Sequence, residues 1–216
     1  MTKIILGAIA WLVILTYQVE AGKTQALVVL KFPTSARSAG MGEVGVSCPT
    51  GIDSVFFNPA GLSLIEQREV SVFYSTLLDI DYGFVGYAQR VNGNKEARLV
   101  VVSLSMATLQ VGDIEINYEN GNGTSRNVAA ESDYVLNLSA ALKLNKRLSA
   151  GINLKKIQSE LVEEVTAKAM AVDFGALLLI SERLNLGAVA QNFGSDVQYR
   201  EKKDPPTLHY KNWSFV

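Results

Sequence analysis

Cysteine and histidine are almost absent from this chain of 216 residues, which contains one of each. A single cysteine, Cys48, cannot form an internal disulfide, so packing and hydrogen bonding must stabilise the fold in an oxidising compartment. We expect the small Cys48 side chain to be buried. His209, the single histidine, excludes multi-histidine metal sites and argues against a Ser-His or Cys-His hydrolase. We therefore expect no enzyme activity, no catalytic residues, no metal and no cofactor.

The chain also lacks an excess of either charge and, beyond its first 21 residues, any long apolar run. It has 20 basic and 21 acidic residues, for a formal net charge of -1. A nucleic-acid-binding protein needs a basic face, so we expect no nucleic-acid partner. No uncharged apolar run in the rest of the chain reaches the ~18 residues of a membrane-spanning helix. This disfavours a helical membrane protein.

Residues 1–21 have the pattern of a secretory signal peptide. Lys3 supplies a positive charge, residues 4–16 form an apolar core, and residues 19–21 offer a cleavage site with small side chains. We therefore expect export from the cytoplasm and a mature chain that begins near Gly22. The alternative is an anchoring helix, although the uncharged run falls just short of the ~20 residues that cross a bilayer.

Alternation of apolar and polar residues after Glu66 predicts β-strands. In the clearest run, residues 134–144, tyrosine, leucine and alanine share one face, while Asn137 and Ser139 lie on the other. Several predicted strands exceed the ~5–6 residues of globular strands and approach the ~10 that a tilted strand needs to cross hydrocarbon. The predicted strands are residues 68–77, 82–91, 98–108, 111–118, 134–144, 148–158, 168–180 and 184–193.

The connections between these strands are of two kinds. Residues 145–147 and 181–183 predict tight polar turns, whereas residues 112–133 and 159–167 predict longer loops. Short turns at one rim and long loops at the other are typical of outer-membrane β-barrels. Tyrosines near the strand ends fit a membrane interface, although strand propensity explains them nearly as well. These are Tyr74, Tyr82, Tyr87, Tyr118 and Tyr134.

A short pattern recurs at a spacing of 36 residues. Residues 146–151, KRLSAG, and residues 182–187, ERLNLG, share a charged residue followed by Arg-Leu-x-x-Gly. A repeat of turn, strand, loop and strand in an up-and-down barrel would produce it. Chance recurrence in two similar turns is the alternative.

A segment rich in glycine and proline, residues 32–64, precedes the strands. Its sequence is FPTSARSAGMGEVGVSCPTGIDSVFFNPAGLSL. Glycine and proline interrupt any regular element every few residues, while Phe56 and Leu62 require burial, so we expect a compact plug or hatch. Residues 40–45 also spell G-x-G-x-x-G, but the strand before and the helix after that a dinucleotide site needs are not predicted. We expect no cofactor there.

Three parts of this segment resemble the N-terminal signature of the PorV/PorQ family: residues 37–42, Asp53, and residues 57–62. Members of this family are outer-membrane β-barrels related to the FadL-type transporters of long-chain fatty acids. The resemblance implies an all-β fold: a membrane β-barrel in the outer membrane of a Gram-negative bacterium, with residues 22–66 as an N-terminal hatch and residues 67–207 as barrel strands. Residues 208–216 form an atypical C-terminal tail.

Related barrels are larger than eight strands. The eight antiparallel strands predicted here would therefore form the N-terminal part of a FadL-like barrel, with two edges left unpaired in hydrocarbon. The final residues also lack the terminal aromatic residue typical of barrel insertion signals, because Val216 follows Phe215. The hypothesis from the sequence is a truncated or frameshifted gene product.

The resemblance implies one of two roles, neither of them enzymatic. FadL-type members admit hydrophobic molecules by moving an N-terminal hatch, whereas PorV-type members act in type IX secretion and carry exported proteins to the surface attachment machinery. The expected partners are outer-membrane lipid, together with either a fatty acid or other hydrophobic ligand, or secretion-system proteins. The signature residues expected to shape the hatch are Arg37, Gly40, Gly42, Asp53, Asn58, Pro59 and Gly61.

Turn chemistry assigns roles to some of these residues. Asn58-Pro59 is expected to set a turn and Gly61 to permit a positive φ, while Arg37 is expected to hold a carboxylate in the lumen. A purely structural role in turn formation explains the same residues equally well. The alternative to a barrel is a soluble secreted or periplasmic β-rich binding module, because a β-sandwich also alternates polar and apolar residues.

Overall fold

Strands dominate the computed structural model of this chain. It describes residues 28–91, 99–117, 125–162, 165–181, 184–195 and 198–201. The expected signal peptide, residues 1–21, and the expected tail, residues 208–216, lie outside these ranges. Among the described residues, no helix is both long enough and apolar enough to cross a bilayer.

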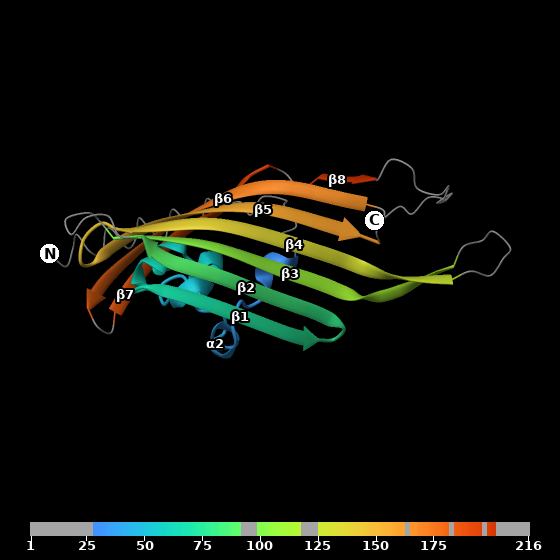
Figure 1. Cartoon of the computed structure of the whole chain (residues 1–216), viewed down its shortest axis with the longest axis horizontal. Coiled ribbons are helices and arrows are strands. Elements are labelled where there is room, and N and C mark those ends of the chain that lie inside the picture. The colour runs from blue at the N-terminus through green and yellow to red at the C-terminus, as the bar shows by residue number, and fades with distance from the viewer. Residues whose placement is uncertain are drawn as a thin grey trace, which may run out of the picture.

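Seven strands follow one another in chain order across one antiparallel sheet, and an eighth, β8, pairs with β6. Figure 1 shows them side by side in a curved sheet. This up-and-down order confirms the expected all-β, barrel-like fold, although the sheet is not closed among the described residues. The strands are β1 (Arg68–Leu77), β2 (Ile80–Val91), β3 (Val100–Asn117), β4 (Ser125–Lys143), β5 (Leu148–Leu161), β6 (Val165–Ser181), β7 (Leu184–Gly194) and β8 (Gln198–Glu201).

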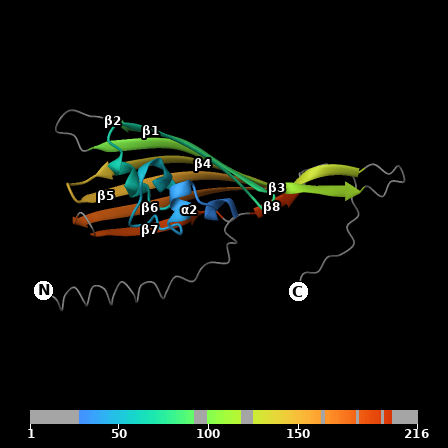
Figure 2. The ribbon, with the colours of Figure 1, turned by 90° about the horizontal axis from the view of Figure 1, so that it is seen from below.

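Strands β3 to β6 extend farther at one end of the sheet than predicted. The ranges 98–108 and 111–118 belong to one strand, β3, because strand pairing continues through Gln110, which lies opposite Ser132 of β4. The long loops predicted over residues 112–133 and 159–167 are therefore wrong. In their place, β3 and β4 extend beyond the sheet as a two-stranded ribbon (Figure 2), and β5 and β6 continue almost to their connection.

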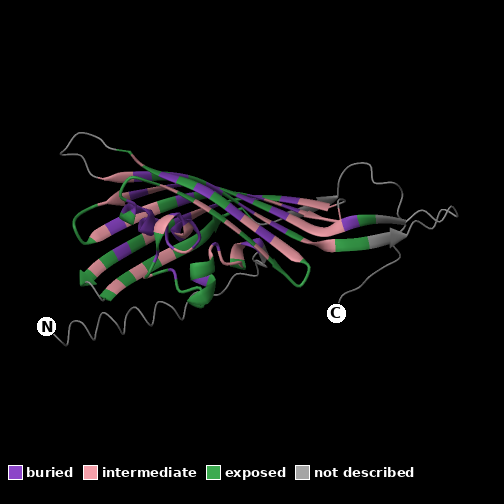
Figure 3. Cartoon of the chain, turned by 60° about the horizontal axis from the view of Figure 1, so that its bottom comes forward, coloured by how far each residue is buried: buried purple, intermediate pink, exposed green. Residues whose placement is uncertain are grey.

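The two faces of the sheet differ in chemistry. Most side chains on the convex face are apolar and exposed, as in Val72 at 75% and Leu138 at 55%. Their sequence neighbours point to the concave face, where Asn137 and Ser139 are buried. Figure 3 shows this alternation as stripes of burial along the strands. The structure thus confirms the predicted apolar face and places it outward.

The N-terminal residues 28–65, here called the plug, lie inside the curve of the sheet (Figure 2). Glycine and proline limit the plug to short helices, and hydrogen-bonding side chains begin two of them: Ser35 accepts from the Ser38 N–H, and Asn58 caps the last helix. These are η1 (Val28–Lys31), α2 (Ala36–Gly40), η2 (Gly51–Phe56) and η3 (Pro59–Leu64), of which α2 is α-helical and the others are 3₁₀ helices.

The apolar core lies between the plug and the concave face. Ile52 and Leu62 of the plug are fully buried in the same cluster as Phe84 of β2. Phe56 meets Phe84 edge to face, with ring centroids 5.8 Å apart. Fully burying one such side chain stabilises a fold by about 1.5–3 kcal/mol. The sheet has no other layer of described residues on this face, so the plug supplies its core.

The tyrosines divide between the two faces. Tyr74, Tyr87 and Tyr134 are exposed on the convex face, where a membrane interface would place them. Tyr82 is fully buried and stacks on Phe32 of the plug at 5.3 Å, so the interface prediction is wrong for this residue. Tyr118 lies outside the described residues.

The β1–β2 turn has a backbone conformation that its residues disfavour. Leu78 and Asp79 join the paired residues Leu77 and Ile80 and have φ values of 50° and 61°. Two-residue turns with positive φ at both positions favour Asn-Gly, because other residues lose about 1–2 kcal/mol each in the left-handed region.

Replacing this pair, Leu78→Asn together with Asp79→Gly, is therefore expected to raise the free energy of unfolding by about 1 kcal/mol. Urea denaturation followed by circular dichroism measures the change. Asp79→Gly alone should give part of the gain. A double variant that unfolds at the same or a lower urea concentration would show that the turn is not strained.

Candidate functional site: the contact between plug and sheet

Three glycines on neighbouring strands form the surface on which the plug rests. Gly151 of β5 and Gly175 of β6 are paired in register, and Gly187 lies in β7. A Cβ at Gly151 would overlap the backbone of Pro59, and a Cβ at Gly187 would overlap that of Val46. Glycine within a strand often marks the close approach of another backbone. We call these three residues the glycine cradle.

Asn58 joins the plug to the glycine cradle. Its Oδ1 accepts a hydrogen bond from the Ala60 N–H at 3.1 Å and so caps η3. Its Nδ2 donates to the carbonyl oxygens of Val46 in the plug and Ala176 in β6, at 2.8 and 2.9 Å. A Cβ at Gly175 would overlap the Oδ1 of Asn58. One buried side chain thus sets the Asn58-Pro59 turn and binds it to β6.

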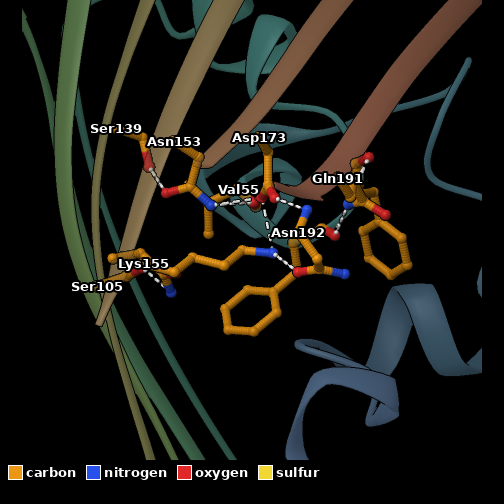
Figure 4. Close-up of polar contacts among 11 residues, drawn as sticks. Val55, Ser105, Ser139, Asn153, Lys155, Asp173, Gln191 and Asn192 are labelled. Atoms are coloured by element: carbon orange, nitrogen blue, oxygen red, sulfur yellow. Dashed lines mark hydrogen bonds and ion pairs between the residues drawn. The ribbon is translucent and has the colours of Figure 1, made fainter. Parts of the chain in front are cut away.

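A buried ion pair lies beside the cradle (Figure 4). The Nζ of Lys155 in β5 is 2.7 Å from Oδ2 of Asp173 in β6, and the two side chains are only 3% and 0% exposed. Asn192 of β7 contacts both: its Oδ1 accepts from Lys155 at 3.1 Å, and its backbone N–H donates to Oδ1 of Asp173 at 2.8 Å. Three strands therefore share one polar network.

A β-bulge brings Asn192 to this network. The register between β6 and β7 shifts between Val172 and Phe174, and Asn192 has a φ of 61°. Asparagine tolerates the left-handed region better than most residues. Bulges commonly redirect a side chain, and this one allows both the backbone N–H and the amide of Asn192 to reach the ion pair.

The network also binds the plug through backbone carbonyl groups. Nδ2 of Asn153 donates to Oδ2 of Asp173 at 3.0 Å and to the carbonyl oxygen of Val55 at 3.1 Å. Nε2 of Gln191 donates to the carbonyl oxygen of Phe56 at 2.8 Å. Carbonyl groups at the end of a helix lack partners within the helix. Two side-chain amides of the sheet therefore satisfy the end of η2.

A carboxylate binds the opposite end of the same helix. Oε1 of Glu69 in β1 accepts a hydrogen bond from the Ile52 N–H at 3.0 Å. An acid at a helix N-terminus is favoured by the helix dipole. Gly51, with a φ of 58°, precedes this contact, and a Cβ there would overlap the Glu69 side chain. The sheet thus holds η2 at both of its ends.

Asp53 lies in η2 and accepts a hydrogen bond from the Ser71 hydroxyl of β1 at 3.2 Å. Burial raises the pKa of Asp53 above its ordinary 3.8, against smaller lowering by Ser35 and Ser71. A raised pKa means that the folded plug favours the neutral carboxyl group. This stabilisation is full below pH 3.8 and is lost as the pH rises through the raised value.

The residues that resemble the family signature lie in two parts of the plug. Asn58 and Pro59 contact the glycine cradle, as described above. Gly61 lies in η3 without a positive φ, so the expected reason for this glycine is wrong. A Cβ at Gly61 would instead overlap the side chain of Pro49.

The remaining signature residues lie on or near α2. Arg37 is exposed, and none of the described residues supplies the lumen carboxylate expected for it. Gly42 has a φ of 66°, whereas Gly40 has no atom within 4 Å of a Cβ placed on it. Arg37 and Asp53 line a small pocket together with Cys48. The Cys48 thiol is exposed, which contradicts the expected burial.

Sequence reasoning missed the polar network of Lys155, Asp173 and Asn192. Its signal was the polar face of the strands, which showed that these side chains could share a surface but not which of them meet. The recurring pattern at residues 146–151 and 182–187 was a signal for the glycine cradle instead, because each copy ends in one of its glycines.

The arrangement binds peptide groups. Two amides and one carboxylate of the sheet bind backbone atoms of the plug, and its glycines admit the plug backbone. Within the described part of the chain, no group of three or more His, Cys, Asp or Glu side chains could hold a metal ion. The contacts described above hold the plug segment in place on the sheet.

A protein-family model matches the plug and the sheet together. The model of a family described as type IX secretion system protein PorV matches residues 17–201, which include the plug and all the described strands. A comparison with curated proteins finds no match.

Gly175→Ala is expected to loosen the plug, because the added Cβ would overlap Oδ1 of Asn58 and lie 2.8 Å from Cδ of Pro59. Limited trypsin digestion at Arg37 should become several times faster. Gly40→Ala is the matched control, since a Cβ there meets nothing within 4 Å. Equal digestion rates in the two variants would show that the cradle does not hold the plug.

Removing one partner of the buried ion pair should be strongly destabilising. Lys155→Met leaves the Asp173 carboxylate without its cation, and breaking such a pair typically costs about 3–5 kcal/mol of unfolding free energy. The double variant Lys155→Met with Asp173→Leu should lose less than the single one, because no charge stays buried alone. Chemical denaturation of the unmodified protein and the two variants measures this, and a double variant that loses at least as much as Lys155→Met would contradict the coupling.

Proposed function

Because the chain belongs to the PorV family of type IX secretion system proteins, we propose that it acts in type IX secretion as an outer-membrane β-barrel protein. In this role it carries exported proteins to the surface attachment machinery, as the family resemblance implies, while the plug keeps the lumen closed. The role is not enzymatic. The family match over residues 17–201 is the observation that carries the proposal.

The apolar convex face supports the outer-membrane location. On β6, every outward side chain from Met170 to Ile180 is apolar. At ~3.4 Å per residue this run is ~34 Å long, and a strand tilt of ~40° reduces its height to about 26 Å. Outer-membrane barrels carry an apolar band ~25 Å tall. A soluble module would instead expose these side chains to water, which is unfavourable for so large a patch.

A polar row marks one edge of this apolar band. It crosses the convex face where side chains of β2 to β6 are paired in register, and the β3–β4 ribbon extends beyond it. The next row inward contains Tyr74 and Tyr134, at the depth where aromatic girdles occur. We call the edge marked by the polar row the ribbon rim. The polar row consists of Asp81, Gln110, Ser132, Glu160 and Thr166.

The ribbon rim fits the outer surface of the cell. Longer projections of outer-membrane barrels are extracellular, whereas the short turns are periplasmic. The opposite rim contains the tight turn at residues 144–147, in which Oδ1 of Asn145 accepts from the backbone N–H groups of Arg147 and Leu148. The length of the ribbon supports an extracellular position for this rim.

The contacts of the plug favour a lumen that stays closed. Plug movement would remove the Asn153 and Gln191 amides from their carbonyl partners, and each buried group left unpaired costs about 1–3 kcal/mol. Uptake of fatty acids or other hydrophobic molecules, the other role implied by the resemblance, requires the hatch to move. The number of contacts that fix the plug weighs against uptake.

A disulfide between plug and sheet separates the two roles. The hydroxyl of Ser63 in η3 donates to that of Ser149 in β5 at 2.7 Å. Ser63→Cys with Ser149→Cys, in a Cys48→Ser background, therefore brings two thiols within bonding reach. In cells that lack the native gene, the oxidised variant is expected to restore export of surface proteins to the unmodified protein's level, because the plug need not leave.

Surface proteomics measures this export, with each single cysteine variant and the reduced double variant as controls. Loss of export on oxidation, recovered with reductant, would show that the plug must move. Deletion of the gene should leave exported proteins inside the cell. Normal export after deletion, with reduced accumulation of labelled fatty acid, would replace the secretion role with uptake.

A further inference from the structure

Two exposed lysines lie side by side on the convex face near the ribbon rim. Lys156 belongs to β5 and Lys168 to β6, and both side chains point outward. Lys156 is paired with Met170, while Gln158 is paired with Lys168, so the two lysines are diagonal neighbours on one face. Residues in this relation are ~7–8 Å apart, within reach of long side chains.

One acid lies near this pair on the same face. Glu160, on the polar row opposite Thr166, is the other diagonal neighbour of Lys168 and lies two rows from Lys156. Neither lysine has a hydrogen bond or an ion pair with any described residue. Like charges on neighbouring strands repel. Lys156 has Lys168 as its charged neighbour and no acid in its own row or in the adjacent rows of β4 to β6, so an external anion would stabilise the pair.

Apolar side chains surround the inner lysine. Leu154 precedes Lys156 on the same face, and Leu136 and Met170 flank it on the neighbouring strands. A lysine facing lipid costs about 2–4 kcal/mol at the midplane of a bilayer but only about 0–1 near its surface. Its long side chain can follow the apolar surface and bring the ammonium group to the headgroups.

We propose that Lys156 and Lys168 bind the phosphate group of a lipid in the outer leaflet. The two ammonium groups match the negative charge and several acceptor oxygens of a phosphate. The apolar side chains beneath them match the acyl chains of the same lipid, which a free phosphate ion lacks. Tyr134 lies in the same row as Lys168, at the depth where tyrosine meets lipid headgroups.

This inference rests on the proposed outer-membrane location, and binding measurements on the full chain test it. The protein in neutral detergent is titrated with lipid A, which carries phosphate groups, and with the same lipid after dephosphorylation. Native mass spectrometry counts the bound lipid. We expect tighter binding of the phosphorylated form. Each single variant, Lys156→Gln or Lys168→Gln, should weaken it about fivefold and the double variant about thirtyfold, from ~1 kcal/mol per lysine.

A matched control changes the same number of charges at the opposite rim. Lys146→Gln with Arg147→Gln alters two exposed side chains in the β4–β5 turn and should leave lipid A binding unchanged. An equal loss in the control pair, or equal affinity for the dephosphorylated lipid, would overturn the proposed site. Displacement of lipid A by inorganic phosphate alone would also overturn it, because the acyl chains would then contribute nothing.

Membrane fractionation of the same variants separates this inference from the function on which it rests. If the unmodified protein is absent from the outer membrane, the proposed function fails together with the lipid site. If all variants reach the outer membrane and lipid A binding does not depend on the two lysines, the lipid site alone fails.

Discussion

Buried polar side chains on the concave face of the sheet need hydrogen-bond partners, and this need links the plug to the strands. Lys155 and Asp173 neutralise each other. Asn153 donates hydrogen bonds both to Asp173 and to the Val55 carbonyl group of the plug, and so connects the ion pair to the plug. Two opposite charges removed from water are tolerated only with good geometry and further hydrogen bonds. Asn192 and Asn153 supply those bonds, so the position of η2 and the conformation of β7 depend on the same ion pair.

The same alternation places the two chemistries of each strand on opposite sides. Leu138 faces outward, while Asn137 and Ser139 face the plug. A shift of one residue in the register would exchange these faces. Such a shift would turn the polar network outward and the leucines toward the plug. Both the apolar convex face and the polar network therefore favour the observed register. The proposed role, in which the plug keeps a lumen closed within a membrane, would depend on this coupling.

Departures from ordinary strand chemistry gather where the plug meets the sheet. Gly151, Gly175 and Gly187 weaken their strands as isolated elements, and Asn192 has a left-handed backbone. Each departure permits a contact that a regular strand would block. The β1–β2 turn is different, since no contact among the described residues explains the positive φ of Leu78. The left-handed backbone of Asn192 in β7 therefore serves the contact between plug and sheet, whereas that of the β1–β2 turn does not.

Much of the architecture was predictable from local pattern. Alternation identified β1 at its observed bounds and showed that Asn137 and Ser139 share a face. Glycine and proline predicted an irregular plug, and the residues around Asn58 carried the family resemblance. Strand lengths were less certain: the pattern predicted a break at residues 109–110, but pairing with β4 continues β3 through them.

Local pattern by itself therefore determined the strand-forming segments, their two faces and the place of the plug in the chain. Tertiary structure alone decided which side chains meet. Asn58 binds the carbonyl of Ala176 across 118 positions of sequence, and Lys155 meets Asn192 across 37. Such contacts depend on the register of several strands together and on a bulge between β6 and β7. Neither follows from the preferences of residues near one another in sequence, because pairing energies arise only after distant segments have been brought together.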